Sequence, residues 1–356
     1  MARARLTIDL DAIVENWRAL DARSAPEVET GAVLKADSYG LGIDKVAPIL
    51  AQAGAQSFFV ALAEEGAELR TILGQDAEIY VLSGLMPGDA PLIEDFRLVP
   101  CLNSREQVEE FASKLKGLPC AVQIDSGMNR LGVEPQDFID LSALLIDLKP
   151  QLLLSHLACA DLPSHPLNDE QMRVFGAASA AMTGIRRSLA ATGGILLGPD
   201  YHYDLVRPGI GLFGGLPFLD AGPVVELVLP VIQVRDVIPG ETVGYGARWT
   251  ASKAARIATV SAGYADGLLR ATGNGMVNLF AGSVACPLVG RLSMDLITVD
   301  VTKLQDVPSH LAILNAHQGI DDLARAATTI GYEFLTGLGG RYERTYCGGE
   351  AAAGSH

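Results

Sequence analysis

The sequence has few cysteines, and those few are scattered. Its 356 residues include five cysteines, and none of them forms a C-x-x-C pair. An odd and unclustered set argues against a disulfide framework and against a zinc site. We therefore expect free thiols in a reducing compartment, and we predict no metal site.

The sequence also lacks long hydrophobic runs. The longest, such as Leu141 to Leu148, are interrupted by a charge, here Asp147. None approaches the roughly 18 to 20 apolar residues that a membrane span needs. The first residues, Met1 to Asp9, lack the apolar core of a secretory signal and are typical of a first strand. We expect a cytoplasmic protein without membrane association.

Positive charge is in short supply. Lysine and arginine total 27 against 42 aspartates and glutamates, a formal net charge of -15. No basic stripe is available to neutralise phosphates, which argues against a nucleic-acid partner. Hydrophobic residues make up 49% and charged residues 19%, so a large core can form and disorder is not expected.

Between residues 10 and 222, short apolar strands alternate with helical stretches. This alternation favours an α/β fold, a (β/α)8 TIM-like barrel, with a doubly wound open sheet as the competitor. The predicted strands are Gly31 to Lys35, Ser57 to Leu62, Glu78 to Leu82, Leu98 to Leu102, Cys120 to Asp125, Gln151 to His156, a short run near Thr192, and Leu205 to Phe213. The predicted helices include Ile43 to Ala53, Ala63 to Leu73, Ser104 to Leu115 and Asn168 to Ala181.

Beyond Pro223 the pattern changes to β-branched strands with glycine and aspartate turns, and only Ile320 to Ile330 has a helical pattern. This predicts a mainly β C-terminal domain over 223–350, joined by the strand 1–9. The remaining residues, 351–356, are small and polar and are expected to form a frayed tail.

Lys35 ends the apolar run Val33-Leu34-Lys35 and is followed by Ala36-Asp37-Ser38-Tyr39-Gly40. A buried ammonium is costly unless it is paired or functional. One interpretation is a lysine whose charged end reaches solvent. The other is a Schiff-base lysine, whose pKa must fall so that the neutral amine can attack an aldehyde.

Three further reactive side chains favour the functional interpretation. Arg130, His156 and Arg207 each lie at or just past the carboxyl end of a predicted strand, where barrel active sites form. Gly209-Ile210-Gly211 near the last strand fits a cradle of backbone N–H groups for a phosphate.

Taken together, these motifs resemble the alanine racemase family of pyridoxal phosphate (PLP) enzymes. The resemblance runs from Leu6 to Arg341. It is carried by the segments around Lys35 and Tyr39, Arg207 to Gly214, Val243 to Ala247, Gly263 to Gly267, and Gly290 to Asp295.

The resemblance implies a role for each matching residue. Lys35 would hold PLP and act as the base for the D-enantiomer, while Tyr245 of the other subunit of a homodimer would act for the L-enantiomer. Arg207 would donate to the pyridine nitrogen, and His156 would lie behind the catalytic tyrosine. The implied phosphate ligands are Tyr39, Thr192, Gly209, Ile210 and Tyr332. The implied substrate contacts are Arg130 and Met294 at the carboxylate, Tyr264 and Arg291 at the substrate entrance, and Asp295 next to Met294.

Several positions depart from the family pattern, among them Asp37 and Leu41 in the lysine motif. Gln123 stands where many members have a lysine that can be carbamylated, and we expect it to hydrogen-bond Arg130 instead. Ala191-Thr192 replaces Asn-Ser, which keeps the hydroxyl but loses the amide. Ser188 replaces a histidine that often supports Arg207.

The chemistry explains why such groups are needed. Racemisation removes a proton from one face of Cα and returns one to the other, so two opposed bases suffice without a large movement. Lysine and tyrosine have ordinary pKa values near 10.4 and 10, so the local field must lower them, and Arg207 with a His156 network are candidates. Because guanidinium cannot give up its proton, Arg207 should keep the cofactor a weak electron sink and suppress transamination.

The expected activity is therefore PLP-dependent, two-base racemisation of alanine, either supplying D-alanine for peptidoglycan or degrading it. A racemase of serine or of broad specificity is an alternative, since a small pocket discriminates poorly by one hydroxyl. A decarboxylase built on the same barrel usually has a longer β domain and a cysteine motif over the substrate. Cys347 lies too near the terminus to fit that motif easily. A PLP-binding protein without turnover would not need the second domain.

Overall fold

The computed structural model describes residues 4–349, with 181 and 274 excepted. It forms two compact units. The barrel unit comprises Val14–Phe213 and Pro217–Ala221, and the β unit comprises the chain up to Ile13, Gly214–Leu216 and the chain from Gly222 onward. The tail predicted over 351–356 lies outside the described residues.

The barrel unit is a closed parallel sheet. Seven strands pair in chain order: β3 (Ala32–Val33), β4 (Ser57–Val60), β5 (Glu78–Val81), β6 (Val99–Leu102), β7 (Ala121–Gln123), β8 (Leu152–Leu154) and β9 (Arg186–Ser188). β2 (Glu29–Thr30) pairs with β10 (Leu205–Val206). Val33 N–H donates to the Pro208 carbonyl and Arg207 N–H to the Ala190 carbonyl, both at 2.9 Å. These bonds join the two ends of the sheet, so the predicted barrel is confirmed and the open sheet is excluded.

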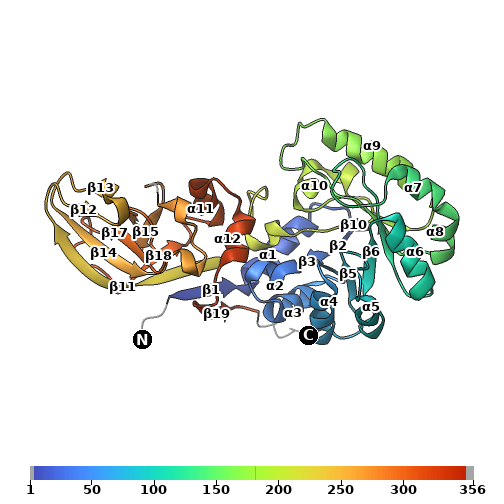
Figure 1. Cartoon of the computed structure of the whole chain (residues 1–356), viewed down its shortest axis with the longest axis horizontal. Helices are drawn as coiled ribbons and strands as arrows, with labels where there is room; N and C mark the ends of the chain where they lie inside the picture. The colour runs from blue at the N-terminus through green and yellow to red at the C-terminus, as the bar shows by residue number, and fades with distance from the viewer. Residues whose placement is uncertain (1–3, 181, 274, 350–356) are drawn as a thin grey trace. The chain divides into compact units, whose positions relative to one another are not determined.

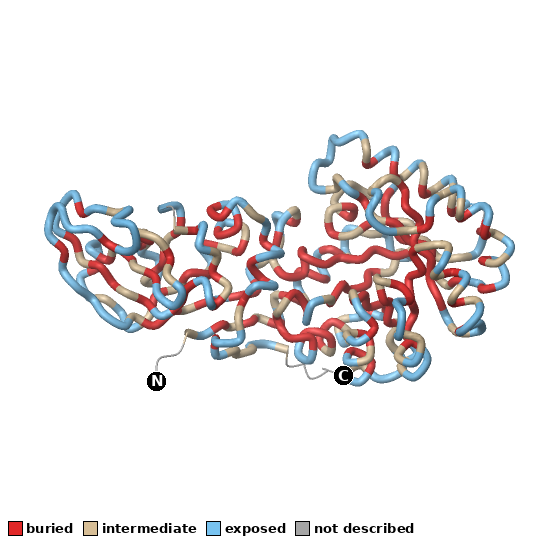
Figure 2. The backbone as a smooth tube through the Cα atoms, viewed as in Figure 1, coloured by how far each residue is buried: buried red, intermediate tan, exposed pale blue. Residues whose placement is uncertain are grey.

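Helices connect the strands and cover the sheet (Figure 1). Strands β4 and β6 are buried at every residue, as expected where a parallel sheet is covered on one face and packed inside a barrel on the other (Figure 2). The helices of this unit are α1 (Leu10–Asp21), α2 (Lys35–Gly40), α3 (Ile43–Ala53), α4 (Ala63–Leu73), α5 (Ala90–Asp95), α6 (Arg105–Lys114), α7 (Pro135–Asp140), α8 (Ser142–Leu148), α9 (Leu167–Ser179) and α10 (Thr192–Leu197).

Two strand predictions in the barrel were wrong in place. The seventh strand is Arg186–Ser188 rather than a run near Thr192, and Thr192 instead begins α10. A search for apolar runs does not find this strand because it is polar. Its first residue, Arg186, forms ion pairs with two glutamates at the amino end of the barrel. The last strand stops at Val206, because Pro208 cannot donate to a sheet and Ile210–Phe213 forms a 3-10 turn.

The β unit is built around the long strand β11 (Val225–Val237). Its main path is β16 (Val284–Pro287), β15 (Asn278–Ala281), β18 (His310–Leu314), β11, β1 (Arg5–Asp9) and β19 (Glu343–Cys347). Off this path, β14 (Ala255–Ser261) pairs with β11 and with β17 (Leu296–Asp300), and β12 (Thr242–Val243) pairs with β13 (Trp249–Thr250). The predicted mainly β C-terminal domain is confirmed.

One helix of the β unit was missed by the sequence analysis. α11 (Ile320–Ala327) matches the predicted helical stretch, but α12 (Gly331–Gly337) follows it and carries Tyr332. Glycine at both ends of this seven-residue helix hides its periodicity.

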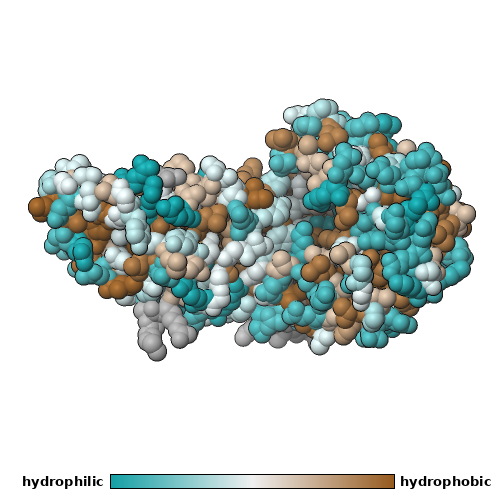
Figure 3. Space-filling model, in the orientation of Figure 1, coloured by the Kyte–Doolittle hydropathy of each residue, from teal (hydrophilic) through white to brown (hydrophobic). Residues whose placement is uncertain are grey.

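Hydrophilic residues predominate on the face of the barrel unit shown in Figure 3, with scattered apolar patches. None of the described helices is long and apolar enough to span a bilayer.

Candidate active site

Lys35 stands at the start of a left-handed turn. The four residues after it, Ala36 to Tyr39, have φ between 53° and 57°, so α2 is left-handed over this stretch. None of the four is glycine, and such backbone costs roughly 1–2 kcal/mol per residue. The turn is held by Leu34, whose N–H donates to the Phe59 carbonyl at 2.8 Å, and by the Asp37 carboxylate, which accepts from Ile43 N–H at 2.6 Å.

The surroundings of Lys35 favour the neutral amine. Burial lowers the pKa of Lys35, and the positive charge of Arg130 lowers it further, while Glu65 acts in the opposite direction. The neutral amine is the form that attacks an aldehyde carbon, and a lowered pKa increases its fraction at neutral pH. The structure therefore supports the functional interpretation of Lys35 over a solvent-directed one.

Arg207 is buried without a carboxylate among its described partners. It donates to the Ser188 hydroxyl and, through Nη2, to the Ser155 carbonyl at 2.7 Å. Burial lowers its pKa to about 10, so the guanidinium keeps its charge at neutral pH. Ser188 in turn donates to the Leu205 carbonyl at 2.5 Å. Arg207 is therefore supported by a serine at the position where the family resemblance led us to expect a histidine in other members.

A cradle of small groups lies beside Tyr39. The Thr192 hydroxyl oxygen accepts from the N–H groups of Gly209, at 3.0 Å, and Gly211, at 3.3 Å. A Cβ on Gly209 would stand 2.3 Å from the Tyr39 hydroxyl, so only glycine lets these segments meet. Because Ile210 opens the 3-10 turn, its N–H has no partner within that turn. Together with the Thr192 hydroxyl hydrogen, this arrangement fits a bound phosphate.

His156 follows β8 and couples electrostatically to Arg207, Arg130 and Lys35. Burial and these three cations lower its pKa to about 3, so the ring is neutral at physiological pH. In a network of His156 and Arg207, the positive charge therefore belongs to the arginine. The ring can take part in hydrogen bonds, whereas the positive field comes from the arginines.

Arg130 is exposed on an ordered loop. The Asp125 carboxylate accepts from the N–H groups of Gly127 at 2.8 Å, Met128 at 2.9 Å and Asn129 at 3.2 Å, which fixes the path toward Arg130. Gln123 donates through Nε2 to the Leu131 carbonyl at 2.9 Å, and no described hydrogen bond runs from Arg130 to its amide oxygen, so the expected Gln123–Arg130 bond is absent among the described residues. The amide holds the backbone next to Arg130 and leaves the guanidinium to bind a ligand.

The other predicted site residues lie in the β unit, several of them strongly exposed. Tyr245 is 69% exposed between two glycines with positive φ, Gly244 and Gly246. Tyr332 and Met294 are also exposed, at 37% and 53%. Exposed aromatic and thioether side chains of this size are candidates for a surface that another molecule covers.

Two loops of the β unit are tied together by an arginine. Tyr264 N–H donates to the Ser293 carbonyl at 3.1 Å, and Ala265 N–H donates to the Met294 carbonyl at 3.0 Å. Arg341 binds Asp266 at 2.6 Å and Asp295 at 2.7 Å, which locks the loops in register. This ion-pair network brings together Tyr264, Met294 and Asp295, while Arg291 lies against Gly244 and Gly246.

Sequence reasoning missed Glu65, Ser155, Asp266 and Arg341. Glu65 is the third residue of α4, and a capping box would have identified it only with a polar residue at Leu62. Arg341 marked the end of the matching region but suggested no partner. Its pairing with Asp266 joins positions 75 residues apart, which no local pattern reveals.

Comparisons with known proteins agree over both units. Residues 8–217 match the model of the alanine racemase N-terminal domain, and residues 224–346 match that of the alanine racemase C-terminal domain. An alanine racemase of Cereibacter sphaeroides is 60% identical over 346 residues, which cover 97% of this chain and 99% of that protein.

Solved structures give the same result. The alanine racemase of Bartonella henselae, solved with covalently bound pyridoxal phosphate, superposes with a TM-score of 0.92 at 35% identity, covering 98% of this chain and 100% of its own. The biosynthetic alanine racemase of Pseudomonas aeruginosa has a TM-score of 0.91 at 35% identity, with the same coverage.

Proposed function

We propose that this chain, which belongs to the alanine racemase family, interconverts L- and D-alanine with PLP held on Lys35. The observation that carries the proposal is the convergence of Lys35, Arg130 and the buried Arg207 on His156 at the carboxyl end of the barrel, where burial and Arg130 lower the pKa of Lys35. The enzyme is thus an amino-acid racemase, an isomerase.

The residues present fit the cofactor. Arg207 is fixed by Ser188 and Ser155 and has no anionic partner among the described residues, as a donor to a ring nitrogen requires. The cradle of Tyr39, Thr192, Gly209 and Ile210 accommodates the phosphate, and we propose Tyr332 as a further phosphate ligand. When bound, PLP makes the α-proton of the amino acid acidic by withdrawing electrons.

Two bases divide the proton transfers. Lys35 takes the proton from Cα of the D-enantiomer, and Tyr245 takes it from the L-enantiomer. Arg130 and the backbone of Met294 bind the substrate carboxylate, while neutral His156 supports the tyrosine. Tyr264 and Arg291 line the entrance, and Asp295 contacts the substrate beside Met294. The ion pairs of Arg341 with Asp266 and Asp295 hold these loops.

The proposal includes a homodimer with shared active sites. Tyr245 is 69% exposed in one chain, and the turn that presents it needs glycine on both sides. A second copy would cover this tyrosine and gain its hydroxyl as a base. The barrel over 10–222 then binds the cofactor, and the β domain over 223–350 with residues 1–9 supplies groups to the partner.

A cytoplasmic location is part of the same proposal. All five cysteines are free thiols, among them the exposed Cys347. Free and exposed thiols fit a reducing compartment.

Chiral analysis of the products from alanine, serine and lysine tests the function directly. We expect alanine to racemise fastest, with serine slower. Reduction with borohydride followed by mass spectrometry should place the cofactor on the peptide that contains Lys35. Turnover of serine or lysine ahead of alanine would contradict the proposed substrate, and an unmodified Lys35 would contradict the proposed cofactor site.

Exchange of the α-proton with solvent tests the two bases separately. Tyr245→Phe should abolish L-to-D turnover and leave exchange from D-alanine measurable, because Lys35 still serves that face. The measurement is deuterium incorporation into each enantiomer, followed by proton NMR. Equal loss of both exchanges would refute the assignment of one base to each face.

A further inference from the structure

Glu65 connects the turn after Lys35 to the neighbouring strand-helix loop. Its Oε1 accepts from Ala36 N–H at 2.7 Å, and Ala36 directly follows Lys35. Its Oε2 accepts from the N–H groups of Ala61, at 2.7 Å, and Leu62, at 3.2 Å. One carboxylate therefore bridges two segments that lie 25 residues apart, Ala36 and Ala61, with all its bonds going to backbone.

We propose that Glu65 is a positioning residue that holds the left-handed turn and thereby aims the Lys35 amine at the aldehyde of PLP. This inference rests on the proposed function, since it concerns the amine to which the cofactor binds. Glu65 touches backbone rather than the reacting atoms, so its effect passes through Lys35.

Two features of the structure carry the argument. First, the turn from Ala36 to Tyr39 is strained and stays left-handed only if its surroundings enforce it. Second, hydrogen bonds to a carboxylate are among the strongest that a backbone N–H can make, and Glu65 makes three. The bond to Ala36 lies one residue from Lys35 and thus limits the direction in which its side chain leaves the chain.

The charge of Glu65 and its hydrogen bond to Ala36 should change the reaction rate of Lys35 in opposite directions. The two effects can therefore be separated by experiment. Glu65 raises the pKa of Lys35, against burial and Arg130, which lower it. His156 and Arg207 belong to the same cluster of charged and titratable groups, and the Asp37 carboxylate lies in the turn itself, where it accepts from Ile43 N–H. Removing the carboxylate should therefore increase the fraction of neutral amine at neutral pH, which alone would speed its reaction. Loss of positioning would slow the reaction.

The experiment measures how fast cofactor-free enzyme binds added PLP covalently. The neutral amine of Lys35 adds to the aldehyde carbon, a C=N bond forms, and the carbonyl oxygen leaves as water with the two amine hydrogens. Absorbance follows this step by stopped flow between pH 6 and pH 10. At the high-pH plateau the amine is neutral in every variant, so the plateau rate reports positioning without the charge effect.

We expect Glu65→Gln to lower the plateau rate about tenfold and Glu65→Ala about a hundredfold. Glutamine has one accepting oxygen and keeps one side of the bridge, whereas alanine keeps neither. Glu64→Gln is the matched control, because Glu64 lies in the same first turn of α4 but is exposed and accepts no described hydrogen bond. It should leave the plateau unchanged.

Plateau rates of Glu65→Gln and Glu65→Ala equal to that of the unsubstituted chain would overturn the proposal. A slowing that merely follows lost stability would also overturn it, so Arg186→Met, a destabilising change at the other end of the barrel, is measured alongside. If Glu65→Ala fails to fold, Glu65→Gln decides. If the unsubstituted chain itself forms no bond with PLP at Lys35, the proposed function fails, which is a different result from normal attachment in every variant.

Discussion

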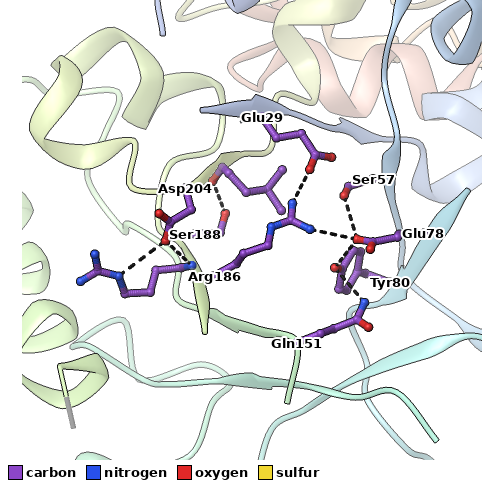
Figure 4. A network of polar contacts seen from close by, with 10 residues as sticks. Glu29, Ser57, Glu78, Tyr80, Gln151, Arg186, Ser188 and Asp204 are labelled. Carbon is purple, nitrogen blue, oxygen red and sulfur yellow. Dashed lines mark hydrogen bonds and ion pairs between the residues drawn. The ribbon is translucent and has the colours of Figure 1, made fainter. Parts of the chain in front are cut away.

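The two ends of the barrel treat positive charge in opposite ways. At the carboxyl end, Lys35, Arg130 and Arg207 gather around His156, and Glu65 is the acidic group that acts on Lys35. At the amino end, Arg186 lies between Glu29 and Glu78, and Glu78 also accepts from Tyr80 at 2.7 Å and Ser57 at 3.3 Å (Figure 4).

This difference separates function from stability. Arginine neutralised by two glutamates cannot lower the pKa of a neighbour much, and Arg186 covers the amino end of the barrel with ion pairs. Arginines without such partners create a positive field that favours a neutral amine and an anionic ligand. The carboxyl end thus keeps positive side chains without paired carboxylates among the described residues, at the end of the barrel where active sites generally form.

The largest effect is expected from an acid placed at the carboxyl end of the barrel. Arg207→Glu should lower the racemisation rate at least about a hundredfold, because the positive charge at the ring nitrogen is lost. It should also release keto acid by transamination, since a carboxylic acid can protonate the ring where guanidinium cannot. Chiral chromatography and a keto-acid assay measure the two outcomes.

Arg207→Gln is the control for that substitution, as it removes the charge without adding an acid. It should lose rate and form no keto acid. If Arg207→Glu forms none either, while its cofactor absorbance shows a folded and loaded enzyme, the account of Arg207 is wrong.

Removing the arginine at the structural end should affect stability and leave the chemistry intact. Arg186→Met leaves Glu29 and Glu78 facing each other half-buried, and we expect about 2 kcal/mol less free energy of unfolding. Urea unfolding measures the loss, and kcat/KM for alanine should stay within about twofold. Arg173→Met breaks an exposed pair with Glu170 and should change neither quantity, whereas a large fall in kcat/KM for Arg186→Met would remove the division between the two ends.

The smallest effect concerns His156 and acid. Its pKa is about 3 in the folded chain, below the ordinary value of 6.5, so the unfolded chain binds a proton that the folded chain refuses. Stability should therefore fall as pH drops from 6.5 toward 3, by about 1 kcal/mol between pH 6 and pH 5. His156→Gln should remove this part of the slope in urea unfolding, and an unchanged slope would contradict the assignment.

The sequence predicted the barrel well because its strands are apolar and its helices periodic. Ile43–Ala53 and Ala63–Leu73 are helices with the predicted bounds. The polar strand Arg186–Ser188 was misplaced, since its side chains satisfy charges that only the closed barrel brings near. Hydrophobic patterns report burial against a core and say little about such pairings.

The sequence singled out candidate site residues but not the groups that hold them in place. Lys35, Arg207, Thr192 and Gly209 stood out through motifs, whereas Glu65 and Ser155 act on backbone or through it. The left-handed turn from Ala36 to Tyr39 could not be read from the sequence either, because four consecutive non-glycine residues normally avoid it. Its conformation is imposed by contacts distant in the chain.

The left-handed turn from Ala36 to Tyr39 carries torsional strain. Backbone angles that strain an L-residue are the relaxed angles of its mirror image. A chain made by chemical ligation with D-alanine in place of Ala36 would therefore relieve part of this strain. The side chain would remain a methyl group, so only the backbone preference would change. The segment that presents the reactive amine is thus folded in the handedness of the enantiomer that the enzyme is proposed to make.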